Sequence, residues 1–180
     1  LMSKIGKINI SIPEKVKVML SGNMINIEGP LGKKSLNIDL DIFNLDIKDG
    51  KEILIKPKKI DSNTKRLWGM NRSLINNAVI GSSTGYEKIL ELVGVGYRAS
   101  LKGEQLNLQL GYSHDINFEI PDGIKITVEK QTILKITGPD KQLIGVVVSK
   151  IKTLRKIEPY KGKGIREKGQ YILKKEGKKK

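Results

Sequence analysis

A compact group of residues suited to contacting phosphates lies near the C-terminus, directly after a predicted helix. Lysines and arginines neutralise phosphates, glycines let a main chain approach closely, and an aromatic ring stacks or hydrogen-bonds. This combination predicts backbone recognition of RNA. The candidate residues are Lys150, Arg155, Tyr160, Lys161, Gly162, Lys163, Gly164, Arg166 and Lys168.

A flexible basic tail is the alternative interpretation of this segment. Such tails rarely place Pro159-Tyr160 and two spaced glycines between their charges, so we favour an ordered extension. Residues 171–180, which end in three lysines, are expected to form a basic tail. The pattern leaves open whether that tail is ordered.

A second glycine pattern lies at Gly94, Gly96 and Ala99 and matches the G-x-G-x-x-A form of a dinucleotide fingerprint. That fingerprint requires a helix to begin at the second glycine, whereas this chain continues into a predicted strand. We therefore expect no nicotinamide enzyme. The glycines instead indicate a bulge or the close approach of another backbone, RNA included.

Catalytic and metal-binding constellations are not predicted. The sequence has no cysteine and one histidine, His114, so no catalytic triad or multi-histidine metal site can form within one chain. We expect no catalytic residue, metal or cofactor. His114 is predicted at the surface or an interface, with RNA contact as the alternative, and Trp68 in a core, with base stacking as the alternative.

The charge is large and unevenly distributed. The chain of 180 residues carries 34 Lys and Arg against 19 Asp and Glu, a net charge of +15. Residues 150–180 hold 13 basic and 3 acidic side chains, so +10 of that charge lies there. A polyanionic partner is expected. No apolar stretch reaches the roughly 20 residues of a membrane-spanning helix, and we expect no membrane partner.

Period-two alternation of apolar and polar residues predicts antiparallel strands joined by short turns, including Ser21-Gly22-Asn23 and Lys102-Gly103. Helical spacing predicts two helices, from the capping residues 61–63 to Gly81 and from Pro139-Asp140 onward. Residues 29–35 are predicted to form a turn between strands.

Strands followed by a helix, twice, indicate an internal duplication. Residues 12–14 resemble residues 120–122, an offset of 108, and residues 29–30 resemble residues 138–139, an offset of 109. We predict an α+β fold of two tandem similar domains, each an antiparallel sheet covered on one face by a single helix. The predicted boundaries are 1–82, 83–170 with the basic extension, and 171–180 for the tail.

Residues 158–165, EPYKGKGI, closely resemble the signature of the bacterial-type ribosomal protein six family of the large subunit. Four further blocks resemble that family, at residues 3–7, 74–81, 90–99 and 108–114. Two positions depart from its pattern: Ile157, where the family generally has proline, and Glu167, where it commonly has an aromatic residue.

The resemblance implies a structural constituent of the large ribosomal subunit, with a duplicated fold, that binds rRNA near the sarcin-ricin loop and the base of the factor-binding stalk. Expected partners are large-subunit rRNA, neighbouring ribosomal proteins and translational GTPases in proximity, with no small-molecule substrate. The expected rRNA-facing residues then include Gly94, Gly96, Tyr97 and Arg98. Heavy use of Lys, Ile and Asn is expected of an AT-rich genome, so we expect a ribosome of a bacterial cytoplasm or of an organelle, mitochondrion or plastid, that encodes its own copy.

Overall fold

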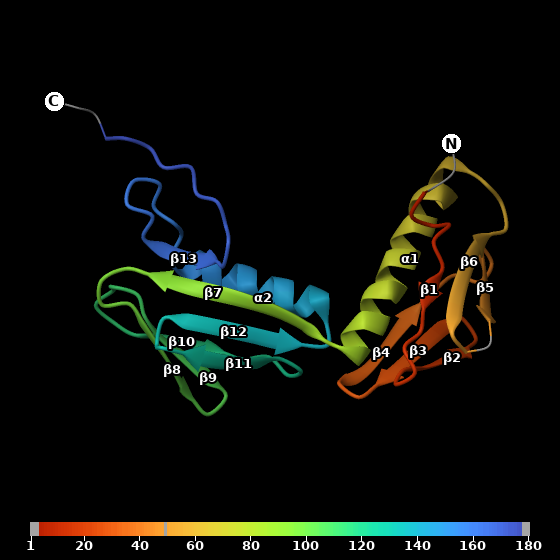
Figure 1. The fold of residues 1–180 in the computed structure, drawn as a ribbon, viewed down its shortest axis with the longest axis horizontal. Coiled ribbons are helices and arrows are strands. Elements are labelled where there is room, and N and C mark those ends of the chain that lie inside the picture. Colours follow the sequence, from red (N-terminus) through yellow and green to blue (C-terminus); the bar gives the residue numbers. More distant parts are fainter. Residues whose placement is uncertain (1–3, 49, 178–180) are drawn as a thin grey trace. The chain divides into compact units, whose positions relative to one another are not determined.

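The computed structural model describes residues 4–48 and 50–177, which form two compact units (Figure 1). Among the described residues, unit 1 comprises 4–48 and 50–85 with 139–141, and unit 2 comprises 86–138 with 142–177. All strand pairs in the described residues are antiparallel, and each unit contains one helix. Neither helix is long and apolar enough to cross a membrane.

In unit 1 the strands divide between two three-stranded sheets, β1-β6-β5 and β2-β3-β4, and α1 packs against both. The elements are β1 (Ile10–Ser11), β2 (Lys17–Ser21), β3 (Met24–Gly29), β4 (Gly32–Asn37), β5 (Phe43–Lys48), β6 (Glu52–Pro57) and α1 (Ser62–Ser83). The turn between β3 and β4 was predicted over residues 29–35, but it is limited to residues 29–32, because Gly32–Asn37 form β4.

In unit 2 the sheets have the orders β11-β12-β7-β13 and β10-β9-β8. The elements are β7 (Tyr86–Val93), β8 (Arg98–Lys102), β9 (Gln105–Gln109), β10 (Ile116–Glu119), β11 (Lys125–Glu129), β12 (Ile133–Gly138), α2 (Lys141–Leu154) and β13 (Gly164–Glu167). The predicted fold class, two similar sheet-and-helix domains, is confirmed, although the division of each unit's strands between two sheets was not predicted.

Each unit has its own aliphatic core, as expected where period-two strands turn one face inward. In unit 2, Leu134 and Ile136 of β12 are fully buried with Val147 and Ile151 of α2. In unit 1, Ile25, Ile53 and Ile75 occupy the corresponding interior. The cores are aliphatic because the chain has few large aromatic residues. Burial of these side chains supplies the main stabilisation of each unit.

Helix α1 differs in detail from the prediction. It begins after Asp61 as expected, but Asp61 makes no side-chain capping hydrogen bond, and the helix runs two residues past Gly81, to Ser83. Trp68 lies in the core of unit 1, as predicted, and its indole N–H donates to the carbonyl of Ile55 at 2.8 Å.

The duplication is visible in strand order and register, but at a different offset from the one the sequence indicated. Both units follow the same order of six strands and a helix among the described residues. In the β2–β3 hairpin Lys17 pairs with Glu28, and in the β8–β9 hairpin Arg98 pairs with Gln109, so both members shift by 81 (98 minus 17, and 109 minus 28).

The same shift of 81 relates the β5–β6 and β11–β12 hairpins, where Asn44 pairs with Lys56 and Lys125 pairs with Thr137. The offset of 108 was wrong because it aligned the second strand of one unit with the fifth strand of the other. Both strands follow a short Ile-Pro-acidic segment, and this local sequence similarity suggested an alignment that the strand order does not support.

At this offset, Gly50 corresponds to Gln131, and both have positive φ, 66° and 59°. A residue with a Cβ adopts this conformation at a cost of about 1 kcal/mol or more, which glycine avoids. We therefore expect Gln131→Gly to raise the free energy of unfolding of unit 2 by about 1 kcal/mol, measured by urea unfolding followed by circular dichroism.

The matched change is Gly50→Gln, which should lower the stability of unit 1 by a similar amount. Trp68, the only tryptophan, lies in the unit 1 core, so its fluorescence reports on that unit alone. Changes of the same sign in the two variants would contradict the correspondence of the two turns.

Candidate nucleic-acid interface

The segment between α2 and β13, residues 155–163, forms an ordered loop, called here the cationic loop. The N–H of Ile165 donates to the carbonyl of Arg155 at 3.1 Å, and the N–H of Glu158 donates to the carbonyl of Lys163 at 2.8 Å. Pro159, within the loop, accepts at its carbonyl from the N–H of Lys175, which lies outside the loop, at 3.0 Å. Main-chain hydrogen bonds therefore fix the path of the loop from both sides.

Two glycines permit this path. Gly162 has φ +71° and donates its N–H to the carbonyl of Glu158, and Gly164 has φ +136°. A Cβ on Gly164 would lie 2.7 Å from the carbonyl oxygen of Lys156, closer than real contacts allow. Both glycines are buried, so they serve the internal geometry of the loop; close approach of an RNA backbone to them stays a prediction.

At the base of the loop, Arg155 is held by two tyrosines. Its Nε donates to the hydroxyl of Tyr97 at 3.1 Å, and its guanidinium lies over the ring of Tyr112, 4.8 Å from the ring centroid. The Tyr112 hydroxyl donates to the carbonyl of Leu154 at 3.1 Å, and the Tyr112 and His114 rings are stacked with centroids 6.3 Å apart. Arg155 is thus part of a stack of planar groups.

The Gly94 and Gly96 pattern supports this arrangement. The turn between β7 and β8 contains no helix start, so the dinucleotide fingerprint lacks its required context. The close approach at Gly94 comes from a ring, because a Cβ there would lie 2.7 Å from the ring of Tyr97. Gly96 has φ +77° and completes the turn. The expected approach of another backbone is not seen within unit 2.

An open groove of about 550 Å³ lies beside these rings. Its lining includes Tyr97, Tyr112, Leu154, Arg155, Lys156 and Lys163. Glu158 lines it too and is the acidic residue among them. The groove therefore combines aromatic surface, cations and one carboxylate.

Two glutamates fasten the strand that follows the loop. Glu91 of β7 accepts from Arg166 of β13 at 2.8 Å, so Arg166, predicted to meet phosphate, is paired within unit 2. Glu167 bridges Lys88 of β7 at 2.8 Å and Lys152 of α2 at 3.0 Å. The hydrogen bond from Lys88, and then that from Lys152, hold the pKa of Glu167 below its usual value.

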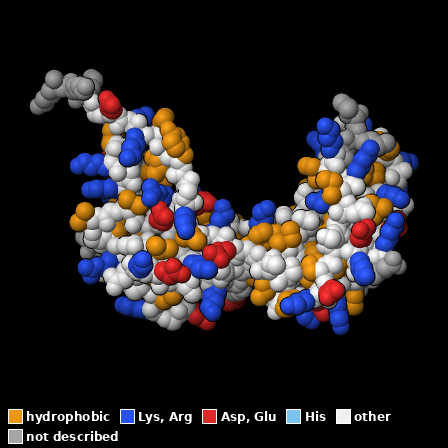
Figure 2. Space-filling view, viewed as in Figure 1, with side chains coloured by type: hydrophobic (Ala, Val, Ile, Leu, Met, Phe, Trp, Pro, Cys, Tyr) orange, Lys and Arg blue, Asp and Glu red, His pale blue; other side chains and the backbone are white. Residues whose placement is uncertain are grey.

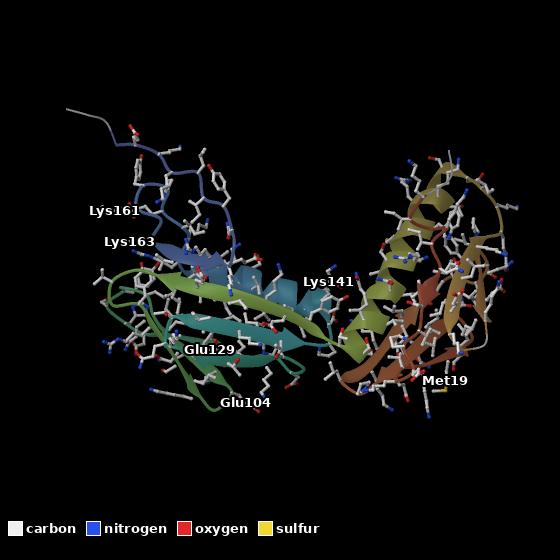
Figure 3. The ribbon with its side chains drawn as sticks, in the orientation of Figure 1. Met19, Glu104, Glu129, Lys141, Lys161 and Lys163 are labelled. Atoms are coloured by element: carbon white, nitrogen blue, oxygen red, sulfur yellow. The ribbon has the colours of Figure 1, made fainter. Side chains whose placement is uncertain are left out.

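Four lysines between residues 155 and 168 are outside this pairing. Within residues 4–48 and 50–177, no side-chain ion pair involves Lys156, Lys161, Lys163 or Lys168, and all four side chains are exposed. Figure 2 shows Lys and Arg side chains gathered over the C-terminal segment of unit 2. In Figure 3, Lys161 and Lys163 lie on the same loop, away from Glu104 and Glu129 at the hairpin turns.

The structure brings some of the predicted residues together and separates others. Tyr97, Arg155 and Lys163 line one groove, whereas Lys150 lies on α2 beside a different groove and Arg98 is exposed on β8. Tyr160 is 54% exposed in the loop. The residue-level prediction missed Tyr112 and Lys156; the block at residues 108–114 contained the only available signal for Tyr112.

These features define a basic α+β protein of two units whose candidate site is a cationic, aromatic surface. The family model of ribosomal protein L6 matches residues 93–168. Large ribosomal subunit protein uL6 of Sphingopyxis alaskensis is 44% identical and that of Beijerinckia indica 46%, each over 179 residues. The Caulobacter vibrioides protein of the same name is 46% identical over 180 residues.

In each of these alignments 99% of this chain and 100% of the relative are covered. The chain belongs to the ribosomal protein L6 family, which confirms the resemblance seen in the sequence.

Gly164→Ala should lower the stability of unit 2 by about 2 kcal/mol or more, because the new Cβ clashes with the backbone at Lys156 and φ is unfavourable. Gly145→Ala is the matched control. Gly145 lies in α2, where an added Cβ would meet open space, so alanine there should stabilise unit 2 by about 1 kcal/mol. Urea unfolding followed by circular dichroism measures both, and a neutral Gly164→Ala would contradict the packing described for the loop.

Glu167→Gln should destabilise unit 2 at neutral pH, because it removes the carboxylate that bridges two lysines. Since the folded-state pKa is lowered, this stabilisation is complete above the ordinary pKa of 4.5 and is lost as the pH falls through the folded-state value. The difference in thermal midpoint between wild type and variant should therefore shrink on acidification. Glu129→Gln, at a residue without an ion pair in the described residues, should show no such pH-dependent difference.

Proposed function

We propose that the protein is a structural constituent of the large ribosomal subunit and binds large-subunit rRNA through the cationic loop and the adjoining residues of β13. The observation that carries this proposal is the group of four exposed, unpaired lysines on an ordered segment. Unpaired cations can neutralise phosphates without first breaking an internal ion pair. An ordered segment also pays less conformational entropy on binding than a free tail does.

Charge and family membership support the same partner. The concentration of +10 of the net charge in residues 150–180 favours a polyanion. The curated relatives are named large ribosomal subunit protein uL6. The residues proposed to face rRNA are Gly94, Gly96, Tyr97, Arg98, Lys150, Arg155, Tyr160, Lys161, Gly162, Lys163, Gly164, Arg166 and Lys168.

The proposed location on the subunit is near the sarcin-ricin loop and the base of the factor-binding stalk, where the protein supports the region at which translational GTPases dock. The resemblance of residues 90–99 and 158–165 to the family signature supports this location. The protein acts there as a rigid support without catalysing a reaction, on ribosomes of a bacterial cytoplasm or of an organelle.

A free-standing nucleic-acid-binding module would be equally basic, and competition distinguishes the two functions. A ribosomal component should stay bound to large-subunit rRNA in the presence of excess bulk tRNA, because its contacts fit one folded site. A general binder would be displaced. Displacement at equal mass of tRNA would contradict the proposed function.

Lys161→Ala and Lys163→Ala should each lower the salt slope of binding to a large-subunit rRNA transcript by up to about one unit per lost phosphate contact. Filter binding across a series of salt concentrations measures the slope. Lys135→Ala is the control, since Lys135 lies on β12 and pairs with Glu87 at 3.1 Å. Equal slopes for all four proteins would place the loop away from RNA.

A further inference from the structure

The groove beside the cationic loop has features that the binding of phosphates does not require. Tyr112 is 44% exposed although its hydroxyl donates to the carbonyl of Leu154 at the end of α2, directly before the loop. The Tyr112 ring is stacked with the exposed His114 ring, and the guanidinium of Arg155 lies over it. These three groups, called here the column, lie next to one another, and two of them, Arg155 and Tyr112, line the open groove.

The groove is lined by three cations, Arg155, Lys156 and Lys163, and one carboxylate, Glu158, so it attracts phosphates overall while its rings offer a stacking surface to a base. The Glu158 carboxylate would repel a phosphate placed beside it. Lys156 and Lys163 line the same groove and are exposed, so they can meet phosphates at its rim. A nucleotide with its base inside and its phosphates at the rim satisfies both conditions.

The dimensions agree with such a ligand. A volume of about 550 Å³ lies within the range of pockets that hold small organic ligands, about 300–1,000 Å³. Bases outside a double helix are commonly recognised by stacking on aromatic side chains and on arginine guanidinium planes. Arg155 contacts both Tyr97 and Tyr112, so its guanidinium is held at the groove before any ligand arrives.

We propose that this groove binds one unpaired RNA base, stacked on Arg155 and Tyr112 of the column, with the flanking phosphates at Lys156 and Lys163. The inference rests on the proposed RNA-binding function and adds that the protein recognises an irregular position in RNA, a bulge or a loop, rather than a regular duplex. Arg155 then acts as a stacking surface as well as a charge.

The test uses the full chain and two RNA hairpins with the same stem, one of which carries a single unpaired adenosine. At low salt a protein of charge +15 binds both measurably, so the readout is the ratio of the two affinities. Wild type should favour the bulged hairpin by about tenfold, the scale of one stacked base. Fluorescence anisotropy of labelled hairpins measures both affinities.

Three variants assign the preference to the column. Tyr112→Phe keeps the ring and should keep the preference, whereas Tyr112→Leu should reduce the ratio to about one. Arg155→Lys keeps the charge but lacks the plane, so it should lower the ratio while the salt slope stays the same. Lys161→Ala should weaken binding to both hairpins equally. Circular dichroism confirms that each variant is folded.

Equal affinities in wild type, or an unchanged ratio in Tyr112→Leu, would overturn the base pocket. That result would leave the salt-slope effect of Lys161→Ala on rRNA in place, so the proposed function would survive. Conversely, displacement from rRNA by bulk tRNA would remove the proposed function whatever the ratio.

Discussion

The antiparallel pairing of β13 with β7 is the interaction on which the candidate interface depends. Gly164 pairs with Val93 and Glu167 with Leu90, so the chain returns to the sheet immediately after the cationic loop. A loop that leaves a helix end and returns to a fixed strand has both ends anchored, and its closure requires little further loss of entropy. Without this return, like charges in the segment would repel one another into an extended tail.

The cations near the C-terminus consequently have two different roles. Arg155, Arg166 and Lys152 contact tyrosines or carboxylates and hold the loop and β13 against unit 2. The side chains of Lys156, Lys161, Lys163 and Lys168 make no ion pair within the described residues, so they add no charge pairing to that framework. Exposed ion pairs of this kind are individually weak, typically below about 1 kcal/mol, so the main-chain hydrogen bonds and glycine packing carry most of the order.

The fold class could be predicted because the period-two and helical spacing of aliphatic residues can be read from the sequence without knowing which elements pack together. The offset of the duplication could not, since residues 12–14 and 120–122 share a local pattern at non-equivalent strands, whereas the true correspondence lies in strand pairing. The cation-rich segment was identified from composition. The pairing of Arg166 with Glu91 and the stacking of Arg155 on Tyr112 depend on residues distant in sequence, which spacing does not reveal.

The two units also differ at one sheet edge. In unit 1 the edge strand β1 spans only Ile10–Ser11, whereas in unit 2 the corresponding strand β7 spans Tyr86–Val93 and β13 covers it along residues 90–93. Long uncovered edges template pairing between chains, and short ones do so poorly. The C-terminal strand that anchors the loop therefore replaces a long edge strand by a short one, Gly164–Glu167, which lowers the tendency of this edge to pair with another chain.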